Sequence, residues 1–185
     1  MVEAQTPVTW VPPTWDEVVR EHADRVYRLA YRLSGNRADA EDLTQETFVR
    51  VYFALDRYHT GYAFSTYIYR IATNLAISEL RRRKRRRLLS LTGLFQNDED
   101  GNVEFQLADN RQLQDLALVE DERSDVIARA IASLPEKYRI AVILRDVEGR
   151  SYEEIAEIMD LGLGTTKSRI SRGRGLLKDK LESYF

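Results

Sequence analysis

Basic side chains gather in two clusters that could bind nucleic acid. Residues 81–87 read Arg-Arg-Arg-Lys-Arg-Arg-Arg and carry a local charge of +7. Residues 165–180 contain six basic residues and one acid, for a local charge of +5. Cationic side chains bind phosphates, and aromatic rings beside them can stack on unpaired bases. Such rings lie on the N-terminal side of the first cluster, at Tyr58, Tyr62, Phe64, Tyr67 and Tyr69.

Catalytic and metal-binding signatures do not occur in this sequence. The chain has no cysteine, and its two histidines, His22 and His59, stand in different segments without a carboxylate-rich ligand spacing. Residues 161–165 resemble part of a phosphate loop, but no Gly-Lys-Ser/Thr follows them. Glu153 and Glu154 are adjacent, so on a helix their side chains point apart. The sequence therefore predicts a non-enzymatic protein with no catalytic residue, no metal site and no cofactor.

Composition places the chain among globular proteins. Its 185 residues are 43% hydrophobic and 31% charged, which is too apolar for wholesale disorder. The net charge is only −2, because residues 98–125 carry ten acids against two arginines and offset the basic clusters. No stretch approaches the roughly 20 apolar residues of a membrane span. Since residues 1–13 also lack a signal-peptide pattern, we expect a cytoplasmic protein without membrane insertion.

The elements that must position the basic clusters are all predicted to be helices. Capping boxes begin at Thr14, Ser133 and Ser151, each with a glutamate three residues later that helps to satisfy the first free amides of a helix. Residues 89–112 show no helical period and are predicted to form a flexible, acidic linker. No alternating β-branched run suggests a sheet. The fold class is therefore all-α, with two small helical domains and helices that begin near residues 14, 36, 65, 113, 134, 151 and 165.

Residues 151–178 fit a helix-turn-helix. A short helix is followed by a glycine-containing turn at 160–164 and by a second, basic helix. Ile155 and Ile170 would pack inward, which leaves the basic face free to enter a DNA major groove. On this geometry four polar side chains face the DNA: Lys167, Ser168, Ser171 and Arg172. The alternative is an amphipathic terminal helix whose basic face is merely solvated.

Four stretches together resemble the extracytoplasmic function (ECF) sigma factors of the sigma-70 superfamily. They keep the order and spacing of that family, and they lie at 39–51, 64–76, 134–139 and 146–170. The resemblance covers nearly the whole chain and implies sigma region 2 over 14–88, a linker over 89–112 and sigma region 4 over 113–185. Two positions depart from the family pattern. Tyr67 stands where a tryptophan is common, and Ser78 stands where an aspartate is common.

The resemblance implies a transcription initiation factor. Such a protein binds core RNA polymerase, directs it to specific promoters and assists DNA opening. Region 2 would bind the polymerase clamp and the promoter −10 element, and region 4 would bind the polymerase flap and the −35 element. Many members of the family are held by an anti-sigma factor, so an anti-sigma factor is an expected partner beside core polymerase and promoter DNA.

Matching positions imply which residues act in each contact. The core-polymerase surface is expected at three positions that share one helix face, Asp42, Gln45 and Glu46. Asn74 matches a family position at the −10 element, and the −10 set is Tyr62, Phe64, Tyr67, Asn74, Arg81 and Arg82. In the −35 set, Arg169 and Arg174 are expected to add phosphate contacts; the set is Lys167, Ser168, Arg169, Ser171, Arg172 and Arg174.

Two other functions stay open on the residues alone. A stand-alone helix-turn-helix regulator with a helical sensor domain accounts for 151–178 but leaves the basic and aromatic segment 58–87 unexplained. A helical adaptor or enzyme with incidental basic patches lacks any catalytic constellation. Co-purification with core polymerase would separate a sigma factor from both.

Overall fold

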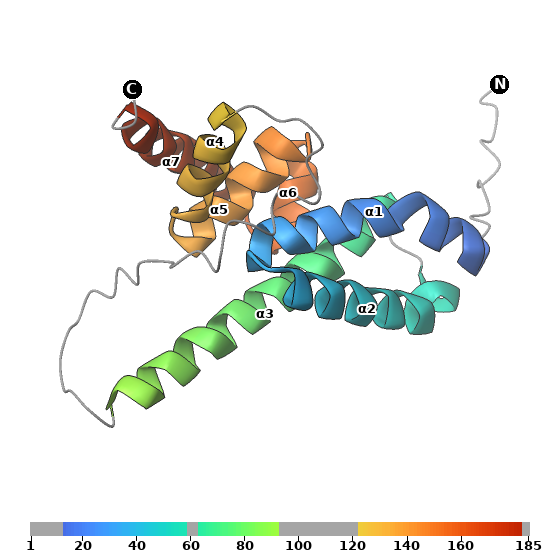
Figure 1. Cartoon of the computed structure of the whole chain (residues 1–185). Coiled ribbons are helices and arrows are strands. Elements are labelled where there is room, and N and C mark those ends of the chain that lie inside the picture. The colour runs from blue at the N-terminus through green and yellow to red at the C-terminus, as the bar shows by residue number, and fades with distance from the viewer. Residues whose placement is uncertain (1–12, 59–62, 93–121, 183–185) are drawn as a thin grey trace, which may run out of the picture.

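The computed structural model describes residues 13–58, 63–92 and 122–182, and within these ranges the chain is helical (Figure 1). The all-α prediction is confirmed for this part of the chain. The predicted linker beyond residue 92 and residues 113–121 lie outside the described residues. The N-terminal bundle contains α1 (Trp15–Ser34), α2 (Arg37–Ala54), a short 3-10 helix (Leu55–Arg57) and α3 (Phe64–Thr92). The C-terminal bundle contains α4 (Glu122–Ala132), α5 (Glu136–Val142), a π-helical turn (Ile143–Val147), α6 (Tyr152–Met159) and α7 (Leu163–Glu182).

Local capping signals set the ends of the first helices. The Glu17 amide donates to Thr14 Oγ1 at 3.4 Å and the Thr14 amide donates to Glu17 Oε2 at 2.8 Å, which completes the predicted capping box. Gly35 ends α1 at φ 79°, a left-handed conformation that glycine adopts without strain. Asn36 then begins α2, because its side chain accepts the Asp39 amide at 3.0 Å.

The core of the N-terminal bundle fixes the direction of α3. α1 packs against both α2 and α3, and the buried side chains include Val26, Leu29, Leu33, Val51 and Ile68. Burying an aliphatic side chain of this size stabilises the fold by about 1.5–3 kcal/mol. The C-terminal part of α3 extends past α1 and α2 (Figure 1). Its basic end is thereby held away from the core and exposed.

The predicted capping box at Ser133 is wrong. The residue before α5 is Pro135, which is extended and makes no side-chain capping bond. Ser133 therefore lies too far from the first amides of α5, and its hydroxyl donates backward to the Ala130 carbonyl at 2.8 Å. The Pro135 ring presets a φ that is compatible with a helix start, and its carbonyl accepts the Tyr138 and Arg139 amides at 2.9 Å and 3.0 Å.

Close packing positions α7 in the C-terminal bundle. The Glu154 amide donates to Ser151 Oγ at 3.1 Å, as the second capping box predicts, and α6 ends at Asp160 with φ 51°. α7 then packs on α5 so closely that a Cβ at Gly173 would lie 2.6 Å from Val142 Cγ2. Only glycine fits at this crossing, so the register of α7 against α5 is specified.

The two bundles are in contact. α3 packs against α6, and buried side chains of both bundles form one continuous apolar cluster (Figure 1). Among the helices that the structure describes, none is both long and apolar enough to cross a membrane.

Candidate nucleic-acid interface

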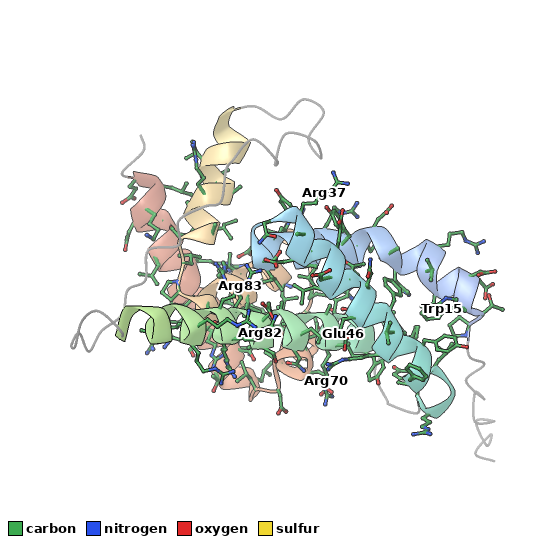
Figure 2. All side chains as sticks on the ribbon, turned by 60° about the horizontal axis from the view of Figure 1, so that its bottom comes forward. Trp15, Arg37, Glu46, Arg70, Arg82 and Arg83 are labelled. Carbon is green, nitrogen blue, oxygen red and sulfur yellow. The ribbon has the colours of Figure 1, made fainter. Side chains whose placement is uncertain are left out.

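The basic end of α3 divides into a paired and an unpaired part. Glu79 accepts from Arg82 Nη2 at 2.6 Å and from Arg83 Nε at 3.3 Å, and Arg83 also pairs with Asp39 of α2. Arg82 and Arg83 are labelled on α3 in Figure 2. The hydrogen bond from Arg82 is the main reason that the pKa of Glu79 lies below its ordinary value. Exposed side chains without an ion pair to any described residue follow, at Lys84, Arg85 and Arg86. These cations are available for phosphates.

The predicted aromatic platform is half-buried. Phe64 and Tyr67 lie on the first turn of α3 with ring centroids 6.4 Å apart and nearly parallel rings. Both contact Tyr58, at 5.1 Å and 5.0 Å between centroids, and Tyr58 is only 4% exposed. Tyr62 lies outside the described residues. The rings therefore form one cluster in which Phe64 and Tyr67 keep part of their surface open.

Asn74, Arg81 and Arg82 are exposed on α3. Tyr69, which the sequence groups with the other aromatics, is instead 2% exposed and faces the C-terminal bundle. An aromatic residue two positions from Tyr67 points to a different side of the helix, so only the fold separates a core ring from an accessible one.

The outer face of α2 combines polar and apolar side chains. Asp42, Gln45 and Glu46 are all exposed there, and Glu46 accepts from Arg50 Nε at 2.7 Å. Glu46 is labelled on α2 in Figure 2. The sequence prediction missed the apolar side chains that continue this surface towards the end of α2. They are Val49, Tyr52 and Phe53, with Phe53 75% exposed. The spacing could have indicated this surface. Val49 follows Glu46 by three residues, and Tyr52 and Phe53 follow Val49 by three and four, which places them on one side of a helix.

The helix-turn-helix is formed by α6 and α7 as predicted from the spacing. Thr166 and Ile170 are buried, and they turn the opposite face of α7 to solvent. Exposed on that face are Lys167, Ser168, Ser171 and Arg172, and Arg169 is partly exposed. Hydrogen bonding to the Arg172 guanidinium is the main reason that the pKa of Tyr138 on α5 lies below its ordinary value. Arg174 makes a bidentate pair with Asp146, through Nη2 at 2.5 Å and Nε at 3.1 Å.

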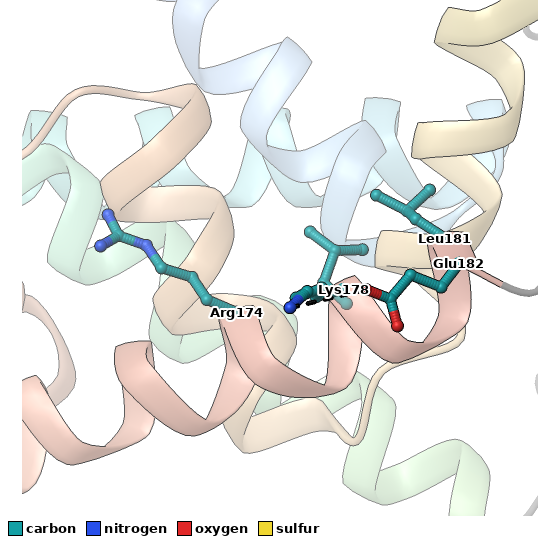
Figure 3. A pocket seen from close by; sticks show the side chains of 5 residues that line it. Arg174, Lys178, Leu181 and Glu182 are labelled. Carbon is teal, nitrogen blue, oxygen red and sulfur yellow. Dashed lines mark ion pairs between the residues drawn. The ribbon is translucent and has the colours of Figure 1, made fainter. Parts of the chain in front are cut away.

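An apolar groove of about 370 Å³ runs along the C-terminal half of α7 (Figure 3). Leu177 and Leu181 line it, and Lys178 pairs with Glu182 at its edge at 3.5 Å. Among the described residues no group of three or more potential ligands could hold a metal ion. The exposed surface of α7 is thus cationic on the face opposite Ile170 and apolar along the groove at its C-terminal end.

Comparison with known proteins decides the family. The sigma-70 region 2 model matches residues 18–86 and the sigma-70 region 4 model matches residues 124–177. The chain is 37% identical to the ECF RNA polymerase sigma factor SigW of Bacillus subtilis over 165 residues, which cover 89% of this chain and 87% of SigW. This chain belongs to the ECF RNA polymerase sigma factors.

Other ECF sigma factors are similar to it. SigE of Mycolicibacterium smegmatis is 48% identical over 93% of this chain, which spans only 63% of the length of SigE. The sigma-E factor of Escherichia coli K12 is 38% identical over 78% of this chain and 74% of its own length. Among solved structures, RpoE of Bartonella quintana in complex with the anti-sigma factor NepR superposes with a TM-score of 0.70, at 25% identity over 91% of this chain and 96% of that chain.

Membership of the family gives the bundles their names. The N-terminal bundle of this ECF sigma factor is sigma region 2, and the C-terminal bundle is sigma region 4. Sigma factors are not enzymes, so membership of this family confirms the prediction of a non-enzymatic protein. Membership also removes the stand-alone regulator as an alternative, because region 2 accounts for the segment 58–87 that the regulator left unexplained.

Proposed function

We propose that this ECF sigma factor binds core RNA polymerase, brings it to promoters with two separate DNA elements and assists their opening. The observation that carries the proposal is the presence of both sigma regions in one chain, each with an exposed cationic helix. Region 4 presents α7, and region 2 presents α3. We also place the protein in the cytoplasm, where the polymerase and the chromosome are.

Core polymerase is proposed to bind the outer face of α2. Asp42, Gln45 and Glu46 would contact the clamp, and the exposed Val49 and Phe53 supply apolar area beside them. Interfaces commonly combine an apolar centre with a polar rim, which supports this assignment. The groove of α7 at Leu177 and Leu181 is the corresponding candidate for the polymerase flap.

The −10 element is proposed to lie along α3. Asn74 and Tyr67 would meet bases, with Phe64 beside Tyr67 in the aromatic cluster. Tyr62, which lies outside the described residues, belongs to the same proposed set. Arg81 and Arg82 would bind phosphates. Stacking of one base on an aromatic ring contributes about 1–3 kcal/mol. An alanine at Tyr67 should therefore leave duplex binding intact and reduce promoter opening, as measured by permanganate reactivity.

The −35 element is proposed to be read by α7. Lys167, Ser168, Ser171 and Arg172 share the exposed face opposite Ile170, and Arg169 and Arg174 would add phosphate contacts. Removing one side chain that binds a base should cost about 1–3 kcal/mol and relax preference at one base pair.

Run-off transcription with core polymerase tests the proposal. Promoters with an intact or a scrambled −35 element are compared for wild type, Arg172→Ala and the control Asp179→Asn, which changes an exposed charge farther along α7. We expect Arg172→Ala to lose most of the preference for the intact element while its affinity for core polymerase is unchanged. Equal discrimination by wild type and Arg172→Ala would remove Arg172 from the reading face.

An anti-sigma factor is proposed as the regulatory partner. The solved structures of RpoE from Bartonella quintana and of CnrH are complexes with the anti-sigma factor NepR and with the cytosolic domain of CnrY, respectively. The CnrH structure covers 91% of this chain at 21% identity with a TM-score of 0.63, so it supports the fold alone. Capture of a partner that blocks binding to core polymerase would test the assignment.

A further inference from the structure

Tyrosines of two other helices flank the exposed face of α7. On α6, the centroid of the Tyr152 ring lies 5.9 Å from Lys167 Nζ. On α5, Tyr138 is hydrogen-bonded to the Arg172 guanidinium. Lys167 and Arg172 are five residues apart in the sequence, which places them about 140° apart around a helix. Each edge of the face that is proposed to meet the −35 element therefore has a tyrosine beside it.

The close approach of α7 to α5 fixes the position of Tyr138. A Cβ at Gly173 would lie 3.4 Å from Tyr138 Cβ and 3.3 Å from the Tyr138 carbonyl oxygen. Gly173 directly follows Arg172, so the missing side chain brings the backbone at Arg172 against the first turn of α5. Buried Val142 holds α5 in the core of the same bundle. The contact between Tyr138 and Arg172 is therefore built on two helices whose spacing is set by close packing.

The Tyr138 hydroxyl lies in a positively charged environment. Hydrogen bonding to Arg172 is the largest cause of its lowered pKa, and the charge of Lys137 adds to the shift. Lys137 Nζ lies 4.9 Å from the centroid of the Tyr138 ring and covers one face of it. Because arginine carries only donors, the Tyr138 oxygen is the acceptor in the bond with Arg172.

A bond to a tyrosine differs from an ion pair in what it leaves available. Arg174 uses two donors on the Asp146 carboxylate, at 2.5 Å and 3.1 Å, so a DNA phosphate must compete with that negative charge. Arg172 is hydrogen-bonded to a hydroxyl and keeps its positive charge available to DNA. A guanidinium has five N–H donors, and a bidentate contact with guanine uses two of them. Arg172 can thus bind Tyr138 and a guanine at the same time.

We propose that Tyr138 is a positioning residue for Arg172, so that α5 as well as α7 determines the preference of this sigma factor for its −35 element. The inference rests on the proposed function of α7. The Tyr138 hydroxyl holds one N–H of the guanidinium and leaves the other donors for the major groove. A long side chain that is already held loses less rotamer freedom when DNA binds. Without the hydroxyl, Arg172 must be ordered by the DNA itself, which weakens the contact.

Transcription by the holoenzyme from substituted promoters tests the proposal. Each base pair of the −35 element is changed in turn, and run-off yields identify the base pair whose preference is lost in Arg172→Ala. Tyr138→Phe removes only the hydroxyl and keeps the ring beside Gly173. The matched control is Tyr152→Phe, which removes the hydroxyl of the tyrosine on the Lys167 side. Thermal unfolding establishes that each variant keeps the stability of the wild type.

We expect Tyr138→Phe to reduce the preference at this base pair about two- to tenfold, as the loss of one hydrogen bond implies. Preference at the other base pairs and affinity for core polymerase should be unchanged. Tyr152→Phe should keep the wild-type preference at the base pair read by Arg172. In the Arg172→Ala background, Tyr138→Phe should have no further effect on that preference, because no guanidinium remains to be positioned.

Three results would overturn the positioning role. The first is wild-type preference in Tyr138→Phe. The second is an equal loss of preference with and without the Arg172 guanidinium, since Tyr138 would then act independently of Arg172. The third is the same loss in Tyr152→Phe, which would make the effect a general one of region 4.

Arginine side-chain NMR on the free protein separates this inference from the proposed function. Tyr138→Phe should shift the Nε–H signal of Arg172, because the contact exists without DNA, and should leave the signal of Arg174 in place. An unchanged Arg172 signal would overturn the contact itself. If this shift were observed while Arg172→Ala kept every base preference, the proposed function of Arg172 would be wrong. The positioning role would be lost with it, whereas the contact with Tyr138 would stand.

Discussion

The two helices proposed to contact DNA are positioned in different ways. α7 is fixed by close packing, since Ile170 is buried and Gly173 lies directly against Val142. The basic end of α3 extends beyond its bundle (Figure 1). Its cations pair with Glu79 of the same helix, with Asp39 of α2, with Glu136 of α5 or with no described residue. A helix that reads base edges needs a fixed register, whereas phosphate binding needs only charge at roughly the right place. On the proposed function, α7 of region 4 would supply sequence preference and the end of α3 would supply affinity.

One cation of α7 is also held in place before DNA binds. Arg174 makes a bidentate pair with Asp146. A phosphate that binds Arg174 must therefore compete with this carboxylate. Lys84 and Arg85 of α3 have no ion pair with any described residue, so no such competition arises there.

The largest expected effect is a loss of stability when the packing of α7 against α5 is disrupted. Gly173→Ala places a methyl group against Val142, and Gly175→Ala is the matched control because its Cβ would meet nothing within 4 Å. Both substitutions raise helix propensity by the same amount. The difference between their free energies of unfolding therefore reports the clash with Val142 alone. We expect Gly173→Ala to have a free energy of unfolding lower than that of Gly175→Ala by about 1–3 kcal/mol, measured by denaturant titration. Equal stability of the two would mean that α7 can shift freely on α5.

The next effect concerns the start of the helix-turn-helix. Ser151→Ala removes the hydroxyl that accepts the Glu154 amide, and should lower the free energy of unfolding by about 1 kcal/mol. Ser151→Asn keeps an accepting side chain and serves as the control. Thermal unfolding followed by circular dichroism would give both values. If Ser151→Ala left the free energy of unfolding unchanged, the packing of Ile155 would be sufficient to begin α6 without the cap.

A weaker effect is expected at the end of α3. The double change Lys84→Ala with Arg85→Ala should reduce binding to all DNA sequences alike and lower the salt slope by about one for each phosphate that is no longer bound. Binding is measured by fluorescence anisotropy at several salt concentrations with matched and scrambled −10 DNA. If the change altered sequence preference, the end of α3 would read bases, as α7 is proposed to do. That result would contradict the distinction between the two helices.

The smallest effect is a pH dependence in region 2. His22 is 6% exposed and contacts Phe64, and burial lowers its pKa below the ordinary 6.5, with Glu21 opposing and Arg25 and Arg150 adding to the shift. The unfolded chain therefore binds a proton more readily than the folded chain, so stability is lost as pH falls below about 6.5. We expect the unfolding midpoint of the wild type to fall more between pH 7.5 and about 5.5 than that of His22→Gln. Parallel curves would show that other groups govern this range.

The sequence by itself determined the helical class, the capping boxes at Thr14 and Ser151, the helix-turn-helix and the family. These depend on local signals: a cap needs two residues three positions apart, and a helix face needs only its own period. The exposed face of α7 follows in the same way, because Ile170 must point inward and thereby directs Lys167, Ser168 and Ser171 outward.

Only the tertiary structure decided which of several similar residues acts. Tyr67 and Tyr69 are indistinguishable by type, yet Tyr69 is buried under Arg150 because α6 packs on α3 there. The Ser133 capping box failed because Pro135 began the helix two residues later. The contacts of Glu148 with Tyr69 and Arg32 likewise join residues far apart in the chain. Periodicity along one helix carries no information about which distant surface will cover it.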